Sequence, residues 1–255
     1  MGPQVARSSV TTQDAEAGCA MLERAYRHLR LERPNATIFR MTLATASAPP
    51  LGFQQLRLAG MPSSGSNDGI PLARIGHLFH GRFTIRSGRH EIHGGGAFLF
   101  PATTYAAFWE DLGLSTLTVE ETVAADYARA VVGREDFRLQ FTGYRPINPA
   151  MERYWRATVA HLVRHVLPND TAMAAPLLRA QMITMVVAAL LQTFPNTFLE
   201  VVSDRSGAGA QGHRPAALRR PGGLHRHPPG RAHRAGRDRR RRQDEPPRIA
   251  GSLPA

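Results

Sequence analysis

Short runs of alternating hydrophobic and polar residues fill the stretch from Leu72 to Val119. Arg82–Arg86 alternates polar and apolar residues, which is the period of a half-buried strand. Glycine and serine interrupt the alternation, and a continuously apolar run, Ala97–Phe100, ends at Pro101. Short, regularly spaced strands with this punctuation predict a β-sandwich or barrel of jelly-roll type.

The same pattern divides the rest of the chain into expected elements. The expected strands are Thr37–Leu43, Leu51–Leu58, Arg82–Arg86, Arg89–His93, Ala97–Phe100, Ser115–Val119 and Phe137–Phe141. Apolar positions three and four residues apart predict the helices Ala15–Leu29, Glu120–Val132, Pro149–Leu167 and Met173–Phe194. Asp14 is suited to cap the first helix, and the last is apolar nearly all round, which predicts burial or a helix–helix interface. Residues 1–13 are expected to be loose, Met61–Asp68 to be a surface loop, and Asp111–Gly113 to separate two strands.

Charge is concentrated at the end of the chain. Residues 203–255 contain 13 of the 32 basic residues, all arginine, but only 4 of the 20 acidic ones. This segment therefore carries a net charge of +9 and the remainder only +3, so the body of the chain is not a typical nucleic-acid binder. The single cysteine, Cys19, excludes an intrachain disulfide and fits a reducing compartment. Met1–Gln13 lacks the apolar core of a signal peptide, and the most apolar run, Met182–Leu191, is too short to span a bilayer, so we expect a soluble, cytoplasmic protein with no membrane partner.

Several weak motifs in a fixed order resemble one family. From about Thr11 to Val201 the chain resembles the effector-binding N-terminal domain of AraC-type transcriptional regulators, in the cupin-like subclass common in actinobacteria. The segments that carry this resemblance are Leu22–Tyr26, Phe98–Pro101, Phe141–Pro146, Arg153–Arg156 and Leu190–Thr197. In that family a β-barrel senses a small molecule, the following helices form a dimer, and a C-terminal module with two helix-turn-helix units reads DNA.

The resemblance implies an α+β fold in four parts. We expect a flexible N-terminus (1–13), a cupin-like β-barrel or jelly roll with an N-terminal helix (14–147), a helical dimerisation segment (148–201) and a disordered basic tail (202–255). The tail departs from the family, because its Arg, Pro, Gly and His residues show almost no apolar periodicity and cannot build a helix-turn-helix. The run Arg237–Arg242 is expected to bind polyanions only non-specifically.

A shifted reading frame is a testable explanation for the tail. Codons that encode Arg220–Pro228 permit, when read one base along, the peptide Ala-Arg-Val-Ala-Phe-Ile-Asp-Thr. Continued through Leu253, the shifted frame permits a helix–turn–helix opening of the kind found in AraC-type DNA-binding modules. We therefore hypothesise that the chain is a truncated regulator whose DNA-binding module was lost to a frameshift near Arg220.

Four histidines in the strand-rich stretch suggest a metal site, as found in many cupins. His77 and His80, like His90 and His93, are three residues apart, so each pair points to opposite faces of a strand. The His-x-His pair and spaced glutamate of a cupin metal motif are missing. A cross-strand pair such as His77 with His90 stays open, but we expect no metal and no cofactor.

Other candidate chemistry is equally sparse. Glu91 and the Glu110–Asp111 pair could serve as acid and base, although exposed strand-edge and turn charges are the commoner use of such residues. Gly94–Gly96 precedes a strand rather than a helix, so it is not a phosphate loop, and Cys19 has no paired-histidine signature. Tyr105, Phe108 and Trp109 either line a pocket or belong to the core.

The leading hypothesis is the sensing and dimerisation part of an AraC-type regulator, without catalytic residues. Its partners would be a small-molecule effector of unknown identity and a second copy of the chain, and no specific operator binding is expected. A stand-alone cupin-like binding protein or enzyme is the alternative from another class. A third reading, a non-specific nucleic-acid binder, depends on the tail alone.

Overall fold

The computed structural model describes residues 5–26, 30–31, 39–60, 63–67 and 72–211. Within these residues, antiparallel pairing joins nine strands into one sheet: β1 (Ala6–Thr12), β2 (Arg30–Leu31), β3 (Arg40–Ala48), β4 (Leu51–Ala59), β5 (Ser63–Asn67), β6 (Leu72–Ser87), β7 (His90–His93), β8 (Gly96–Leu99) and β9 (Tyr105–Glu120). The helices are α1 (Ala15–Ala25), α2 (Glu121–Val132), α3 (Pro149–His161), the π-helical turn η1 (Leu162–Val166), α4 (Asp170–Ala174), α5 (Pro176–Thr193) and α6 (Thr197–Gln211).

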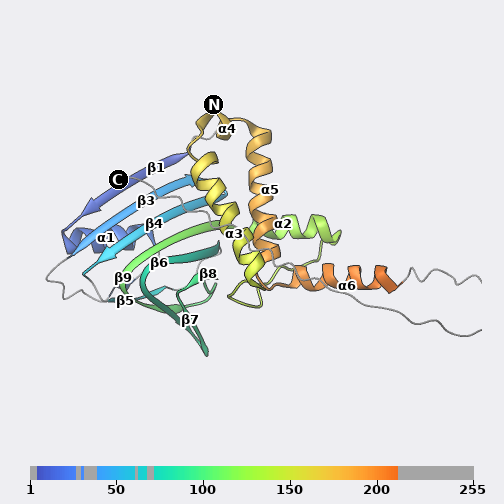
Figure 1. Ribbon diagram of the computed structural model, residues 1–255, viewed down its shortest axis with the longest axis horizontal. Coiled ribbons are helices and arrows are strands. Elements are labelled where there is room, and N and C mark those ends of the chain that lie inside the picture. The colour runs from blue at the N-terminus through green and yellow to red at the C-terminus, as the bar shows by residue number, and fades with distance from the viewer. Residues whose placement is uncertain (1–4, 27–29, 32–38, 61–62, 68–71, 212–255) are drawn as a thin grey trace, which may run out of the picture. The chain divides into compact units, whose positions relative to one another are not determined.

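Two long strands, β6 and β9, organise the sheet. They pair with each other from Leu72 opposite Glu120 to Arg86 opposite Ala106. β4 and β5 pair with successive halves of β9, while β8 and β7 pair with successive parts of β6. β3 and β1 extend the sheet beyond β4, and β2 extends it beyond β5, so the whole sheet curves around β6 and β9 (Figure 1).

The bend in the two long strands occurs where their register slips. The β6–β9 pairing shifts between Leu78 and Arg82, and the opposite strand places Asp111 at a φ of +47°. Gly81 has a φ of +77°, and a Cβ atom on it would lie 1.9 Å from the Asp111 carbonyl oxygen. Only glycine fits there, and such bulges are the usual device by which a strand turns a corner.

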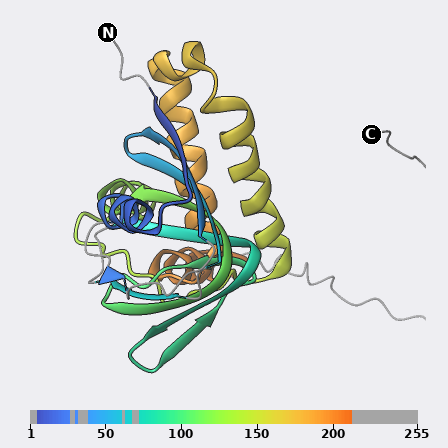
Figure 2. The ribbon, with the colours of Figure 1, turned by 90° about the vertical axis from the view of Figure 1, so that its left-hand side faces the viewer.

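The sheet has an inner and an outer face with different cover. In Figure 2, α1 lies on the hollow side of the sheet, while α3 and α5 stand together on the other side. Leu22 of α1 and Tyr26, which follows the helix, are buried in a cluster with inward-facing residues of β3, β4, β6 and β9. Trp155 of α3 and Val187 of α5 belong to a second cluster that covers the outer face.

Most predicted elements are found, some with altered limits. Asp14 caps α1 by accepting hydrogen bonds from the amides of Glu16 and Ala17. The helices predicted over 120–132, 149–167 and 173–194 correspond to α2, to α3 with η1, and to α5. The expectation that residues 1–13 are loose was wrong for β1, which pairs with β3 along its whole length. Its serines and threonines show no amphipathic pattern, because an edge strand is held by backbone hydrogen bonds and by hydroxyl pairs such as Ser8 with Thr45.

Three further predictions of local structure were wrong. The loop expected over 61–68 contains β5, a strand of small residues that pairs with Tyr105–Trp109 of β9. β9 continues through Asp111–Gly113, because a bulge absorbs the residue that departs from the alternation. The strand expected over Phe137–Phe141 makes only an isolated bridge from Phe141 to Asn196, and its apolar residues serve packing instead.

The first residues of the segment expected to be a disordered tail, 202–211, lie in a helix. α6 starts at Thr197 and continues to Gln211, so the first residues assigned to the tail extend a helix. Helical hydrogen bonds require no amphipathic pattern, which explains why composition alone gave no sign of this continuation. The rest of the predicted tail, including Arg237–Arg242, lies outside the described residues.

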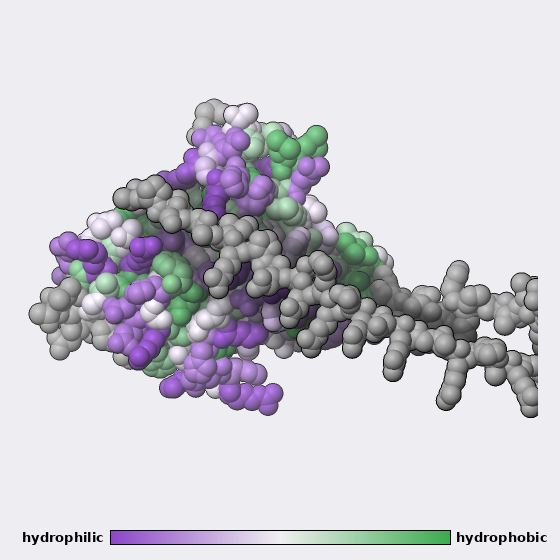
Figure 3. All heavy atoms as spheres, in the orientation of Figure 1, coloured by the Kyte–Doolittle hydropathy of each residue, from purple (hydrophilic) through white to green (hydrophobic). Residues whose placement is uncertain are grey.

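α5 is the only helix of the described residues that is long and apolar enough to cross a membrane. Its C-terminal half is part of the domain core, where Val186, Leu190 and Leu191 are fully buried. At its N-terminal end Leu177 and Leu178 are 81% and 54% exposed. Figure 3 shows hydrophobic surface at this end of the molecule, where α4 meets α5.

Candidate functional site

A half-open cavity lies between α1 and the inner face of the curved sheet; we call it the inner cavity. Its walls come from α1, β2, β4, β5, β6, β9 and the segment after β8. The apolar lining residues are Leu22, Leu31, Leu56, Leu58, Phe83, Phe100, Ala107, Leu112 and Leu114. Its polar lining comes from Tyr26, Asn67, Arg74, Tyr105 and Trp109.

Arg74 is the only charged side chain in the described lining of the inner cavity. It is 7% exposed, and its guanidinium lies over the rings of Tyr26 and Phe100, 5.3 and 5.7 Å from their centres. No carboxylate faces it in the described lining. A buried charge is costly to desolvate, and stacking on two rings offsets only part of that cost. The position therefore favours an anionic or strongly accepting ligand group.

Several polar atoms around Arg74 lack a hydrogen-bond partner of normal geometry. They are the Tyr26 hydroxyl, Arg74 Nε, Trp109 Nε1 and Thr116 Oγ1. Burial raises the pKa of Tyr26, and the nearby Arg74 charge opposes the rise. Burial likewise raises the pKa of Tyr105, which Arg74 again opposes. Both phenols are thus neutral at physiological pH, and the cavity wall presents mainly hydrogen-bond donors.

The size of the inner cavity limits what it can hold. Its volume is about 60 Å³. A water molecule needs roughly 10–15 Å³ of such space, so the cavity has room for a few waters or a very small organic molecule. Drug-sized ligands occupy pockets of roughly 300–1,000 Å³. The chemistry of the wall suits a small acid better than a large ligand.

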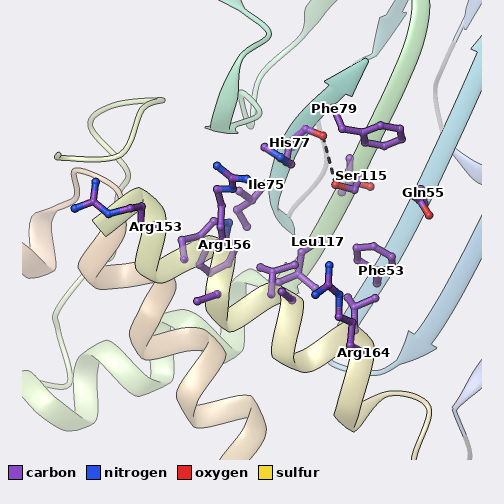
Figure 4. A pocket seen from close by; sticks show the side chains of 17 residues that line it. Phe53, Gln55, Ile75, His77, Phe79, Ser115, Leu117, Arg153, Arg156 and Arg164 are labelled. Carbon is purple, nitrogen blue, oxygen red and sulfur yellow. Dashed lines mark hydrogen bonds between the residues drawn. The ribbon is translucent and has the colours of Figure 1, made fainter. Parts of the chain in front are cut away.

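A larger opening lies on the other face of the same strands; we call it the outer groove. It has a volume of about 600 Å³ and runs between β4, β6 and β9 on one side and α3 with η1 on the other (Figure 4). The sheet contributes Phe53, Gln55, Ile75, Gly76, His77, Phe79, Ser115, Thr116 and Leu117. The helix contributes Arg153, Trp155, Arg156, Ala157, Val159, Ala160, Val163 and Arg164.

The four histidines considered as metal ligands do not converge. His77 pairs with Ala97 and Ser115 and lines the outer groove, whereas His90 lies on β7, which pairs with Thr84–Ser87. The cross-strand pair of His77 with His90 is therefore not formed. His90 stacks edge-on against Tyr144 at 5.4 Å, and His93 is exposed beside Glu91. Among the described residues, no three His, Cys, Asp or Glu side chains are grouped as metal ligands would be.

The candidate carboxylates are separate surface charges. Glu91 pairs with Arg86 and Glu110 with Arg82, both at 3.3 Å. Asp111 accepts a hydrogen bond from the Gly60 amide across the bend. Burial, followed by the charge of Glu23, raises the pKa of Cys19, so its thiol is held in the poorly nucleophilic protonated form.

The three aromatic candidates divide between the two faces of β9. Tyr105 and Trp109 line the inner cavity, and Phe108 is 40% exposed under the guanidinium of Arg86. The sequence analysis missed Arg74, the residue that most distinguishes the cavity. A signal was present, because Arg74 stands between Ala73 and Ile75 in an otherwise apolar strand start. The three arginines of the groove follow a helical spacing that also occurs on solvated helix faces.

The fold was compared with known proteins. No protein-family model and no curated protein sequence matches the chain. Among solved structures, the AraC-like transcriptional activator CuxR is 14% identical, covers 82% of this chain and 81% of its own, and has a TM-score of 0.50. KdgF from Halomonas sp. covers 31% of this chain and 80% of its own at 17% identity and a TM-score of 0.27. A cupin 2 conserved barrel domain protein from Rhodopseudomonas palustris covers 47% and 79% at 12% identity and a TM-score of 0.26.

The match to CuxR extends over most of both chains, so it includes both the barrel and the helices that follow it. At this identity the likeness concerns the fold and not the ligand. The predicted α+β architecture, a curved antiparallel sheet followed by packed helices, is confirmed. The resemblance of this chain to AraC-type regulators is thus confirmed at the level of its fold.

Proposed function

We propose that this chain is the ligand-sensing part of an AraC-type transcriptional regulator and that its effector binds in the inner cavity. The observation that carries the proposal is Arg74, a buried cation with no carboxylate partner among the described residues, in a cavity walled by donors. Such an arrangement is costly in the empty protein and becomes favourable when an anion enters. With a volume of about 60 Å³, the cavity suits a small carboxylic acid.

The lining of the inner cavity suits ligand sensing better than catalysis. General acid–base catalysis needs a group that exchanges protons near neutral pH. The titratable groups of the described lining are Arg74 and two tyrosines, and burial raises the pKa of both tyrosines. These groups can bind and orient an anion, but they are poorly suited to move its protons.

The test is a thermal-shift series on the full chain with acids and their neutral counterparts. Acetate, propionate and benzoate would be compared with acetamide, propionamide and benzamide in wild type, Arg74→Met and Arg86→Met. Arg86 is the matched control, because its guanidinium stacks on Phe108 at 5.1 Å on the surface. We expect at least one acid, and not its amide, to raise the Tm of wild type and of Arg86→Met only. Equal shifts in Arg74→Met, or no acid-specific shift in wild type, would reject the proposal.

We further propose that the regulator is a cytoplasmic homodimer that pairs through the N-terminal end of α5. Leu177 and Leu178 are exposed there beside α4, and apolar surface of this kind favours association. Leu177→Glu with Leu178→Glu should shift the mass measured by sedimentation from dimer to monomer. Val131→Glu is the control, because Val131 is a 49% exposed apolar residue on α2. A monomeric wild type would contradict the proposal.

The final part of the proposal concerns the missing DNA-binding module. We propose that the residues from about 220 to 255 replace it through a lost base near Arg220, so the chain itself would not bind an operator specifically. Translating the coding DNA in all frames from about codon 200 onward is the test. A neighbouring frame that continues into two helix-turn-helix units is the expected result, and its absence from every frame would contradict the frameshift.

A further inference from the structure

The outer groove has the dimensions of a ligand site. At about 600 Å³ it is some ten times larger than the inner cavity and falls in the range of small-molecule pockets. Ala157 and Ala160 face the sheet where longer side chains would close the gap between helix and strands. Space of this size beside small residues is available to a ligand without a change of fold.

The charge of the groove is unbalanced. Arg153, Arg156 and Arg164 line it, and none of them forms an ion pair with a described residue. The described lining contains no acidic side chain. The nearest carboxylate in sequence, Glu152, accepts a hydrogen bond from the Ala97 amide and is thereby occupied. Three like charges on one helix repel one another, and an anion would relieve that repulsion.

The positions of the arginines suit a ligand that lies along the helix. Figure 4 shows Arg156 and Arg164 extending from the helix toward the strands. They are eight residues apart, which corresponds to roughly 12 Å along a helix axis. A molecule between them would reach across the two alanines and meet a guanidinium at each end.

The opposite wall of the groove is apolar with a few polar atoms. Phe53 is only partly buried and Phe79 is 38% exposed, so their rings offer a surface against which a flat group can pack. His77 Nδ1 is buried and has no hydrogen-bond partner, and Ser115 donates to the His77 carbonyl (Figure 4). This wall is suited to a ring, and the helix wall is suited to its negative charge.

From these observations we infer that the outer groove is a second ligand site, for a small molecule that joins a phosphate or carboxylate to a flat apolar ring. The site is separate from the inner cavity, and the inference does not depend on the proposed function. A ligand here would contact α3 and the outer face of β6 and β9 together. It would therefore hold the helix against the strands that carry Arg74 on their inner face.

The experiment is a fluorescence titration of the full chain with 1-naphthyl phosphate, repeated with 1-naphthol and with inorganic phosphate as a competitor. The variant is Arg156→Gln with Arg164→Gln, and the matched control is Arg134→Gln, which removes an exposed arginine far from the groove in sequence. Arg74→Met reports binding in the inner cavity instead. Since residues 203–255 add 13 arginines, the binding that remains in the double variant measures the non-specific background of the tail.

We expect the double variant to weaken binding of 1-naphthyl phosphate at least tenfold, and Arg134→Gln and Arg74→Met to leave it within twofold. We also expect 1-naphthol to bind at least tenfold more weakly and inorganic phosphate to compete poorly. Ala160→Leu fills the groove without changing its charge and should weaken binding as well. Unchanged binding in the double variant, loss in Arg74→Met alone, or inorganic phosphate binding as tightly as 1-naphthyl phosphate would overturn the inference.

Discussion

The two faces of β6 and β9 use arginine in opposite ways. On the inner face Arg74 is 7% exposed, stacked between two aromatic rings and enclosed by α1. On the outer face the arginines of α3 and η1 are exposed to solvent beside an open groove. Neither set has a carboxylate partner among the described residues, yet the physical consequence differs greatly between them.

Burial decides how strongly an unpaired charge indicates a ligand site. Exposed arginines keep most of their hydration, so their lack of a partner costs little, and only their gathering around an acid-free groove is informative. A buried arginine has lost its hydration and must recover it from its surroundings. The two aromatic rings offset only part of the hydration free energy that Arg74 loses. One buried arginine on the inner face is therefore as strong an indication of an anion site as three exposed arginines on the outer face.

The largest effect should come from the bend that creates the two faces. Gly81→Ala would force a side chain into a φ of +77° and against the Asp111 carbonyl oxygen. Strain and clash together should lower the free energy of unfolding by about 3 kcal/mol. Gly88→Ala is the control, since Gly88 has a φ of +54° with nothing within 4 Å of an added Cβ, and it should cost about 1 kcal/mol. Urea unfolding of both variants measures the difference, and equal losses would mean that the bend tolerates a side chain.

The next effect tests the cost of Arg74 directly. Arg74→Met keeps the stem of the side chain and removes its charge. Because no described carboxylate pairs with the buried charge, we expect the unfolding free energy of the ligand-free protein to rise by about 1–2 kcal/mol. Arg86→Met removes a surface arginine with a similar ring contact and should change the unfolding free energy by less than about 0.5 kcal/mol. A loss of stability in Arg74→Met would show that the residue holds the barrel together, and the difference between the two faces would then disappear.

The sequence predicted the amphipathic strands and helices better than it predicted β1, β5 and the bulge at Asp111. In amphipathic runs such as Arg82–Arg86 and the helix from Pro149, the periodicity of apolar residues indicates the type of element and its buried face. Both elements are found where they were expected. β1 and β5 were missed because their serine, threonine and glycine residues pair through the backbone, which leaves no side-chain pattern. The bulge at Asp111 looked like a strand end for a similar reason, because one extra residue reverses the alternation.

The candidate site was less predictable than the fold. Tyr105 and Trp109 were recognised as pocket candidates, and strand alternation separates them from Phe108, but which face points inward depends on how β9 packs. Arg74 becomes a candidate binding residue only once its side chain is known to face inward, because an arginine on the outer face of the strand would be a common surface residue. The outer groove depends on how closely α3 approaches the sheet, which no local pattern reports.

A smaller effect should appear at alkaline pH on the inner face. Burial raises the pKa of Tyr26, so the folded protein keeps the phenol proton while the unfolded chain releases it above the ordinary pKa of about 10. The stabilising contribution is complete below that pH and is lost as pH rises toward the folded pKa, with a slope of at most about 1.4 kcal/mol per pH unit. Tyr26→Phe should flatten the loss of stability measured between pH 10 and 11. Tyr154→Phe, at a 49% exposed position, should leave the slope unchanged, and equal slopes in all three proteins would count against a buried phenol.

The smallest effect concerns an ion pair at the surface, in which an exposed arginine has a carboxylate partner. Arg7 of β1 donates to Asp170 at 2.6 Å and also to the Leu167 carbonyl, and this hydrogen bond holds the pKa of Asp170 below its usual range. The contribution is therefore present above the ordinary pKa of about 3.9 and is lost as pH falls through the lower folded value. Arg7→Gln should weaken amide-exchange protection in β1 at pH 6, and its difference from wild type should shrink as the pH falls below about 3.9. Arg134→Gln breaks the comparable exposed pair with Asp136 and should not affect β1, because that pair joins residues of one loop. If Arg7→Gln left β1 protected, backbone pairing with β3 alone would fix the edge strand, and the ion pair would be a solvated contact of no structural consequence.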